Sequence, residues 1–117
     1  MRYLPVFLLL TAIGFSAAAV GTRTIDVTIQ NRTVTSPGQV IRVSEGDQIV
    51  LRFSSDEAVE LHLHGYDIEL DVEPGTPAEM KFEATASGRF PVTSHGFAGQ
   101  HDEHGHSTLL YIEVYPE

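Results

Sequence analysis

The segment VSEGDQIVLRFSSDEAVELHLHGYDIEL, Val43 to Leu70, decides the fold class because short apolar runs alternate in it with turn-forming residues. The stretches SEGDQ and SSDEA are rich in residues that favour turns, and the run IVLRF between them is strongly β-prone. In the next run, Leu61 and Leu63 occupy alternate positions, the pattern of a strand that buries one face. We therefore predict strands on both sides of the SSDEA turn.

The same organisation continues outward in both directions. Ile25, Val27 and Ile29 alternate with polar residues in TIDVTIQ, and further strands are predicted in QVIRV, AEMKFEA, SGRFPVT and TLLYIEVY. The stretches SPG and EPGTP supply turns, and no segment has the apolar spacing of a stable helix. These features predict an all-β domain, a Greek-key β-sandwich of seven to eight strands.

The first twenty residues, MRYLPVFLLLTAIGFSAAAV, have the pattern of a secretory signal: one arginine, an apolar run and then small residues. We predict cleavage after Ala18 or Ala19, so that residues 1–19 are a signal peptide and residues 20–117 form the domain. An uncleaved anchor is the alternative, but Pro5 and Gly14 interrupt a run already at the short limit for spanning a bilayer. We expect a periplasmic or secreted protein with no membrane insertion after cleavage.

The charge balance indicates which classes of molecule the protein is expected to bind. The chain carries 7 basic and 16 acidic residues, and loss of Arg2 with the signal leaves six against sixteen, a net charge of −10 with neutral histidines. Such a surface disfavours nucleic acids and anionic membranes and favours cations. There is no cysteine, so disulfides do not contribute to stability.

The histidines are concentrated in one half of the chain and form two groups. His62 and His64 are two residues apart, so on a strand both project from one face, either to solvent or at the strand end where Gly65 permits a bend. The others lie in one glycine-rich loop before the last strand. In a Greek-key sandwich this loop can meet the end of an earlier strand, so we expect the groups to share one pole. The candidate metal ligands are His62, His64, His95, His101, His104 and His106.

Imidazole suits copper, zinc, nickel and iron, and the affinity of a common site rises toward Cu(II). Two groups with an H-x-H pair and an H-x-x-H-x-H loop indicate metal binding more strongly than a single histidine would. Asp102 and Glu103 either join as oxygen ligands or raise the negative potential around the cation. The alternative is a metal-free polar loop.

The segment VSEGDQIVLRFSSDEAVELHLHGYDIELDVEPGTPAEMKFEATASGRF, Val43 to Phe90, resembles the middle of small cupredoxin-like domains. The shared features are the E-G-D turn before an apolar strand, the His-Gly-Tyr-Asp segment, the Pro-Gly turn and the G-x-F motif before the ligand loop. The similarity extends from about Thr24 to Pro116. It implies a cupredoxin-type sandwich.

The resemblance also implies that two of the family's usual copper ligands are absent from this chain. Blue-copper members of the family hold the ion with a histidine at the end of a central strand and with a cysteine, a histidine and usually a methionine in the last loop. Ser94 stands at or near the cysteine position and His106 at about the methionine position, while Met80 falls in a core pattern. Without a thiolate, ordinary blue-copper electron transfer is excluded. The family positions favour His64, His95 and His106 as the main ligands, and His62, His101 and His104 for a second or alternative site.

These inferences predict a periplasmic or secreted copper-binding protein that binds, buffers or delivers copper and is not an enzyme. Cu(II) is the expected ion and zinc the second choice. The expected partner is the metal ion, with a copper-delivery protein or a membrane metal transporter as a further candidate. The alternatives are a zinc- or iron-handling module, a metal-free interaction domain of the same fold, and an enzyme with a mononuclear copper open to substrate.

Overall fold

The computed structural model describes residues 2–3, 12–14, 21–97 and 107–117. In these ranges the chain is built from strands, and none of the described residues belongs to an α-helix. A search of the same residues finds no helix long and apolar enough to span a membrane. The prediction of an all-β domain is therefore confirmed.

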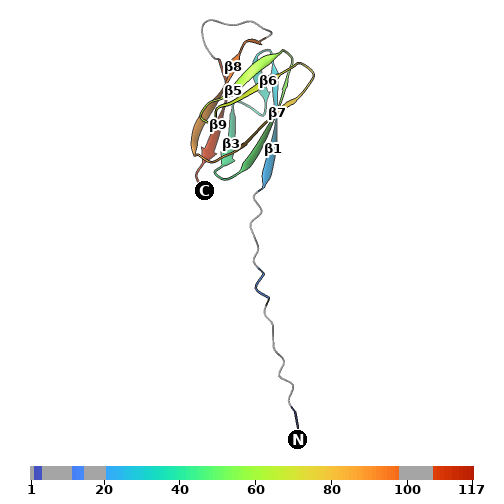
Figure 1. The fold of residues 1–117 in the computed structure, drawn as a ribbon. Helices are drawn as coiled ribbons and strands as arrows, with labels where there is room; N and C mark the ends of the chain where they lie inside the picture. Colours follow the sequence, from blue (N-terminus) through green and yellow to red (C-terminus); the bar gives the residue numbers. More distant parts are fainter. Residues whose placement is uncertain (1, 4–11, 15–20, 98–106) are drawn as a thin grey trace.

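Two mixed sheets contain all of the strands in this part of the chain (Figure 1). The strands are β1 (Thr22–Gln30), β2 (Thr33–Ser36), β3 (Val40–Ser44), β4 (Gln48–Ser55), β5 (Val59–Leu63), β6 (Ile68–Val72), β7 (Ala78–Glu83), β8 (Gly88–His95) and β9 (Ser107–Tyr115). One sheet has the order β2-β1-β4-β7 and the other the order β3-β9-β8-β5-β6. The pairs β1–β4 and β3–β9 are parallel, and the remaining neighbours are antiparallel.

The described chain has nine strands, whereas the sequence predicts seven to eight. The four-residue strand β2 is too short to show a pattern of alternation. The run VELHLHGYDIEL is two strands, β5 and β6, because the chain reverses between them through Gly65, with φ of 89°, and Asp67, with φ of 58°. The reversal places β6 antiparallel to β5 and gives the five-stranded sheet its outer edge on this side.

Alternating apolar side chains from both sheets fill the space between them. In β4, Ile49, Leu51 and Phe53 are buried while the intervening residues are exposed or half-buried. Met80 in β7 and Val92 in β8 are also fully buried, as their alternation predicts. Val92 belongs to the five-stranded sheet, so the inner face of that sheet also contributes to the core.

On the outer face, the β3–β9–β8 half of this sheet is occupied by paired charges. Glu113 accepts hydrogen bonds from Arg42 at 3.3 Å and from the Tyr115 hydroxyl at 2.9 Å, and Arg89 lies 3.8 Å from its carboxylate. Arg89 also stacks 3.8 Å from the centre of the Tyr111 ring. The Tyr115 hydrogen bond, followed by the bond and charge of Arg42, holds the pKa of Glu113 below its ordinary value.

Replacing Tyr115 with phenylalanine is expected to raise the pKa of Glu113 toward its ordinary value. A lowered folded-state pKa stabilises the protein above the unfolded-state pKa, and this contribution is lost as the pH falls through the folded-state value. The variant should therefore lose less stability on acidification. An NMR titration of the Glu113 carboxyl carbon measures the shift directly, and an unchanged midpoint would show that the tyrosine is not its main cause.

Candidate metal site

Strand β5 divides its side chains between the two faces of the sheet as the sequence predicts. Leu61 and Leu63 have no exposed surface and point into the core. Glu60 and His62 alternate with these leucines and are half-buried. His64, the first residue after β5, is also half-buried. The H-x-H pair thus lies on the outer face, and His64 also lies just past the end of β5, so both placements left open by the sequence apply.

The pairing of β5 with β8 brings a third imidazole to the same face. His62 is opposite Thr93 and Glu60 is opposite His95, so His95 is the diagonal neighbour of His62. The ring centre of His62 lies 4.1 Å from that of His64 and 6.2 Å from that of His95. His62 and His95, which are 33 residues apart in the sequence, are therefore close together on this face. The family positions rank His62 below His64 and His95.

Two oxygen atoms contact the rings of this pair. His62 Nε2 lies 3.4 Å from Asp67 Oδ1, and His64 Nε2 lies 2.8 Å from Thr93 Oγ1. Thr93 is 5% exposed, so its hydroxyl is almost fully covered. The backbone amide of His64 donates to the carbonyl of Pro91, which extends the β5–β8 pairing by one residue. Each ring of the pair therefore has an oxygen atom within hydrogen-bonding distance of its Nε2 atom.

Of the two histidine groups, the described residues include His62, His64 and one member of the second group, His95. Because β5 and β8 are antiparallel, the start of β5 lies beside the end of β8, where the loop toward β9 begins (Figure 1). His64 lies just past the opposite end of β5, and its ring meets that of His62 on the outer face of the sheet. His101, His104, His106, Asp102 and Glu103 lie outside the described residues.

Ser94, which stands near the family's cysteine position, is on the opposite face of the sheet from these rings. It is 6% exposed, is paired with the core residue Leu61, and donates a hydrogen bond to the carbonyl of Ser107 at 3.3 Å. A hydroxyl in this place offers no thiolate for a blue-copper centre. The sheet also separates it from His62 and His95, so a single ion cannot bind to all three.

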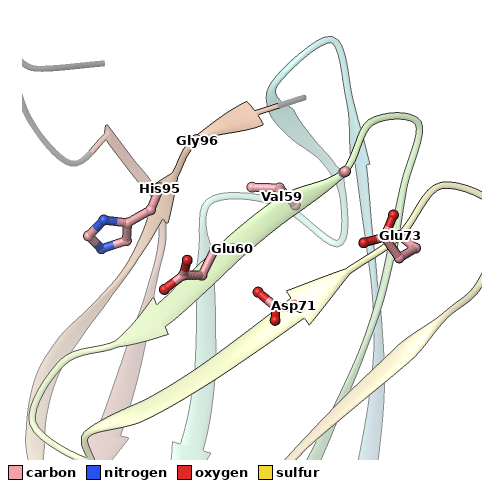
Figure 2. A pocket seen from close by; sticks show the side chains of 7 residues that line it. Val59, Glu60, Asp71, Glu73, His95 and Gly96 are labelled. Carbon is pink, nitrogen blue, oxygen red and sulfur yellow. The ribbon is translucent and has the colours of Figure 1, made fainter. Parts of the chain in front are cut away.

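Carboxylates surround the histidines on the side of β6. Glu60, Asp71, Glu73 and His95 line a pocket of about 170 Å³, and Figure 2 shows Glu60 between His95 and Asp71 on adjacent strands. Glu69 is opposite His62 in the β5–β6 pairing. Sequence reasoning placed the acidic surroundings at Asp102 and Glu103 and missed these residues. The i, i+2 pattern that places Glu60 on the face of His62 and His64 could have revealed the first of them.

This arrangement places imidazole nitrogens close to several carboxylates. Such surroundings attract a cation and suit Cu(II) or Zn(II). Within the described ranges, no group of three or more His, Asp or Glu side chains is close enough to hold an ion in the observed conformation. Coordination by the imidazoles of His62, His64 and His95 would require their rings to turn.

Solved structures with the same arrangement of strands identify the fold. A chain in the cryo-EM structure of a heme-copper terminal oxidase dimer matches with a TM-score of 0.66 and 18% identity, over 83% of this chain and 66% of that one. A blue copper oxidase from Nitrosomonas europaea matches with a TM-score of 0.65 and 19% identity, over 83% and 40%. The chain has the cupredoxin fold. A third cupredoxin match, the solution structure of a copper-binding protein in its apo form, has a TM-score of 0.61 and 11% identity, over 81% and 89%.

The likeness is one of structure and not of sequence. No family model and no curated protein sequence matches this chain. The cupredoxin domain described here spans about two thirds of the oxidase-dimer chain and less than half of the blue copper oxidase. The predicted resemblance to the cupredoxin fold is thus confirmed, and the chemistry has to be argued from this chain's own residues.

Proposed function

We propose that this chain is an exported copper-binding protein that binds, buffers or delivers copper in the periplasm or outside the cell, after removal of residues 1–19. The observation that carries the proposal is the gathering of the rings of His62, His64 and His95 on one outer sheet face. His101, His104 and His106 are proposed to add ligands from the following loop. The structural neighbours include a blue copper oxidase and a copper-binding protein.

Binding and exchange fit this site better than electron transfer or catalysis. Its ligands are imidazoles, the chain contains no cysteine, and the only methionine of the domain, Met80, is buried in the core. Imidazoles bind Cu(II) without the thiolate that tunes a blue-copper centre. A site on the outer sheet face, close to acidic residues, also suits a copper-delivery protein or a membrane metal transporter as the exchange partner.

A comparison of two triple variants tests the proposal. One replaces His62, His64 and His95 with alanine, and the other replaces His101, His104 and His106. Loss of the face ligands is expected to weaken Cu(II) binding by at least about 100-fold, since removing groups that merely support a ligand already costs about 10–100-fold. Isothermal titration and counting of bound ions measure the loss, and the wild-type Cu(II) EPR spectrum should show a wide, nitrogen-dominated hyperfine pattern.

The loop variant removes the same number of imidazoles, and we expect it to weaken Cu(II) binding less than the face variant does. Full Cu(II) affinity in the face variant would contradict the assignment to the outer face. A narrow, blue-type hyperfine splitting would contradict an all-imidazole site. Parallel titration with Zn(II) separates copper handling from the zinc alternative, and no uptake of either ion would leave a metal-free interaction domain.

A further inference from the structure

The turn between β1 and β2 has an arginine at a position where the backbone favours glycine. Asn31 and Arg32 both have a positive φ, 50° and 61°, in the left-handed region. Glycine adopts this conformation without strain and asparagine tolerates it, whereas a long side chain incurs a steric cost. Such a residue persists where the surrounding structure compensates the cost, and the contacts of the Arg32 side chain do so.

The Arg32 side chain contacts two segments that are distant from it in the sequence. Its Nε and Nη2 atoms donate to the two carboxylate oxygens of Glu57 at 3.1 and 3.3 Å. The guanidinium also lies over the Phe97 ring, 5.3 Å from the ring centre, within the range of a cation–π contact. The backbone N–H of Asn31 donates to the Asp56 carboxylate at 3.0 Å, which holds the turn against the same segment. Arg32 thus bridges the turn before β5 and the segment after β8.

These two segments continue into two walls of the acidic pocket beside His95. One wall is formed by residues 58–60, directly after Glu57, and the other includes residues 95–96, directly before Phe97 (Figure 2). Phe97 is 8% exposed and belongs to the core, so the second wall is anchored at this point. The Arg32 contacts therefore connect the two walls from outside the pocket.

Backbone pairing between the two walls ends before the residues that Arg32 contacts. In the β5–β8 ladder, the last pair at this end of the sheet is Glu60 with His95. Glu57 lies three residues before that pair, and Phe97 lies two residues after it. The side chain of Arg32 thus joins the two segments beyond the end of their ladder.

We propose that Arg32, with Glu57 and Phe97, forms a salt-sensitive clamp that holds the β5 wall of the pocket near the β8 wall, and that release of this clamp opens this end of the sheet. The ion pair can respond to the solvent because the Arg32 and Glu57 side chains are 45% and 31% exposed. Salt screens exposed charges and weakens such a pair. Opening widens access to Glu60 and His95, whichever ion the histidines bind.

Hydrogen exchange of backbone amides in the metal-free protein tests the clamp. Arg32→Gly removes the side chain, so exchange at residues 57–60 and 95–97 should become about 10-fold faster, the combined effect of losing an exposed ion pair and a cation–π contact. Urea denaturation should show a global stability close to that of wild type, because relief of the turn offsets the lost contacts. In the wild type, raising the salt concentration should speed exchange at the same amides more than in Arg32→Gly.

Two further variants isolate the role of the side-chain contacts. Glu57→Gln removes the other charge without altering the β1–β2 turn, and it should reproduce the faster exchange. Arg89→Ala is the matched control, because it removes an ion pair with Glu113 and a ring contact with Tyr111 away from the pocket. This control should leave exchange at residues 57–60 and 95–97 as in wild type.

The distribution of the exchange rates decides the outcome. Wild-type rates around the pocket in Arg32→Gly or in Glu57→Gln would overturn the clamp. Equal acceleration in the core strand β4 would also overturn it, because the contacts would then stabilise the whole domain and not this end of the sheet. Since exchange is measured without metal, failure to take up Cu(II) would contradict the proposed function and leave the clamp standing.

Discussion

Replacing Leu61 with alanine should lower the free energy of unfolding by about 2–5 kcal/mol, the range for removing a large aliphatic side chain from a packed core. Leu61 has no exposed surface and lies in β5 between two strand partners, β6 and β8, so the surrounding sheet has little freedom to close the cavity. Urea denaturation monitored by circular dichroism measures the loss.

The adjacent substitution His62→Ala is the matched control because it removes a side chain from the other face of the same strand. We expect it to change stability much less and to reduce Cu(II) affinity, while folded Leu61→Ala protein should keep the wild-type ion count. These opposite effects of the two variants on stability and on Cu(II) affinity follow from the alternation of faces along β5. Equal destabilisation by the two variants would mean that the His62 side chain contributes as much to packing as the Leu61 side chain does.

Replacing Gly65 with alanine should lower the free energy of unfolding by a similar amount, for two separate reasons. With φ of 89°, the residue is in a conformation that costs an L-amino acid about 1–2 kcal/mol. An added Cβ would also overlap the Phe90 ring, standing 2.7 Å from its Cε1 atom, and such overpacking costs about 1–3 kcal/mol. The ring cannot withdraw easily because it packs edge-on to Tyr66, whose hydroxyl donates to the carbonyl of Ala86.

The control variant Gly75→Ala separates the backbone cost from the overpacking cost. Gly75 has a similar φ of 78°, but nothing lies within 4 Å of the position its Cβ would take, so only the backbone cost applies. Gly65→Ala should therefore be the more destabilising in denaturant unfolding, and Phe90→Leu in the same chain should recover part of the difference. If the two glycine variants lower the free energy of unfolding equally, the close approach of Phe90 adds nothing to the cost of Gly65→Ala.

Much of the fold could be predicted because its signals are local. The alternation of Leu61 and Leu63 with His62 and His64 assigns the core and outer faces of β5 without any knowledge of its neighbours. Short strands such as β2 (Thr33–Ser36) escape this reasoning because four residues contain too few repeats. The sequence allows a bend at Gly65, but it does not show that the chain reverses there, because apolar residues continue on both sides of it.

The all-β class of the domain, the shared face of its H-x-H pair and the lack of a thiolate for a blue-copper site can all be read from the amino-acid sequence. The residues around that pair are known only from the folded chain: His95 and Thr93 from β8, Asp67 from the turn, and the carboxylates of β6. This difference arises because side-chain alternation is a property of one strand. Register and neighbours depend on hydrogen bonding between strands that are distant in sequence, and on a core shared by the whole domain.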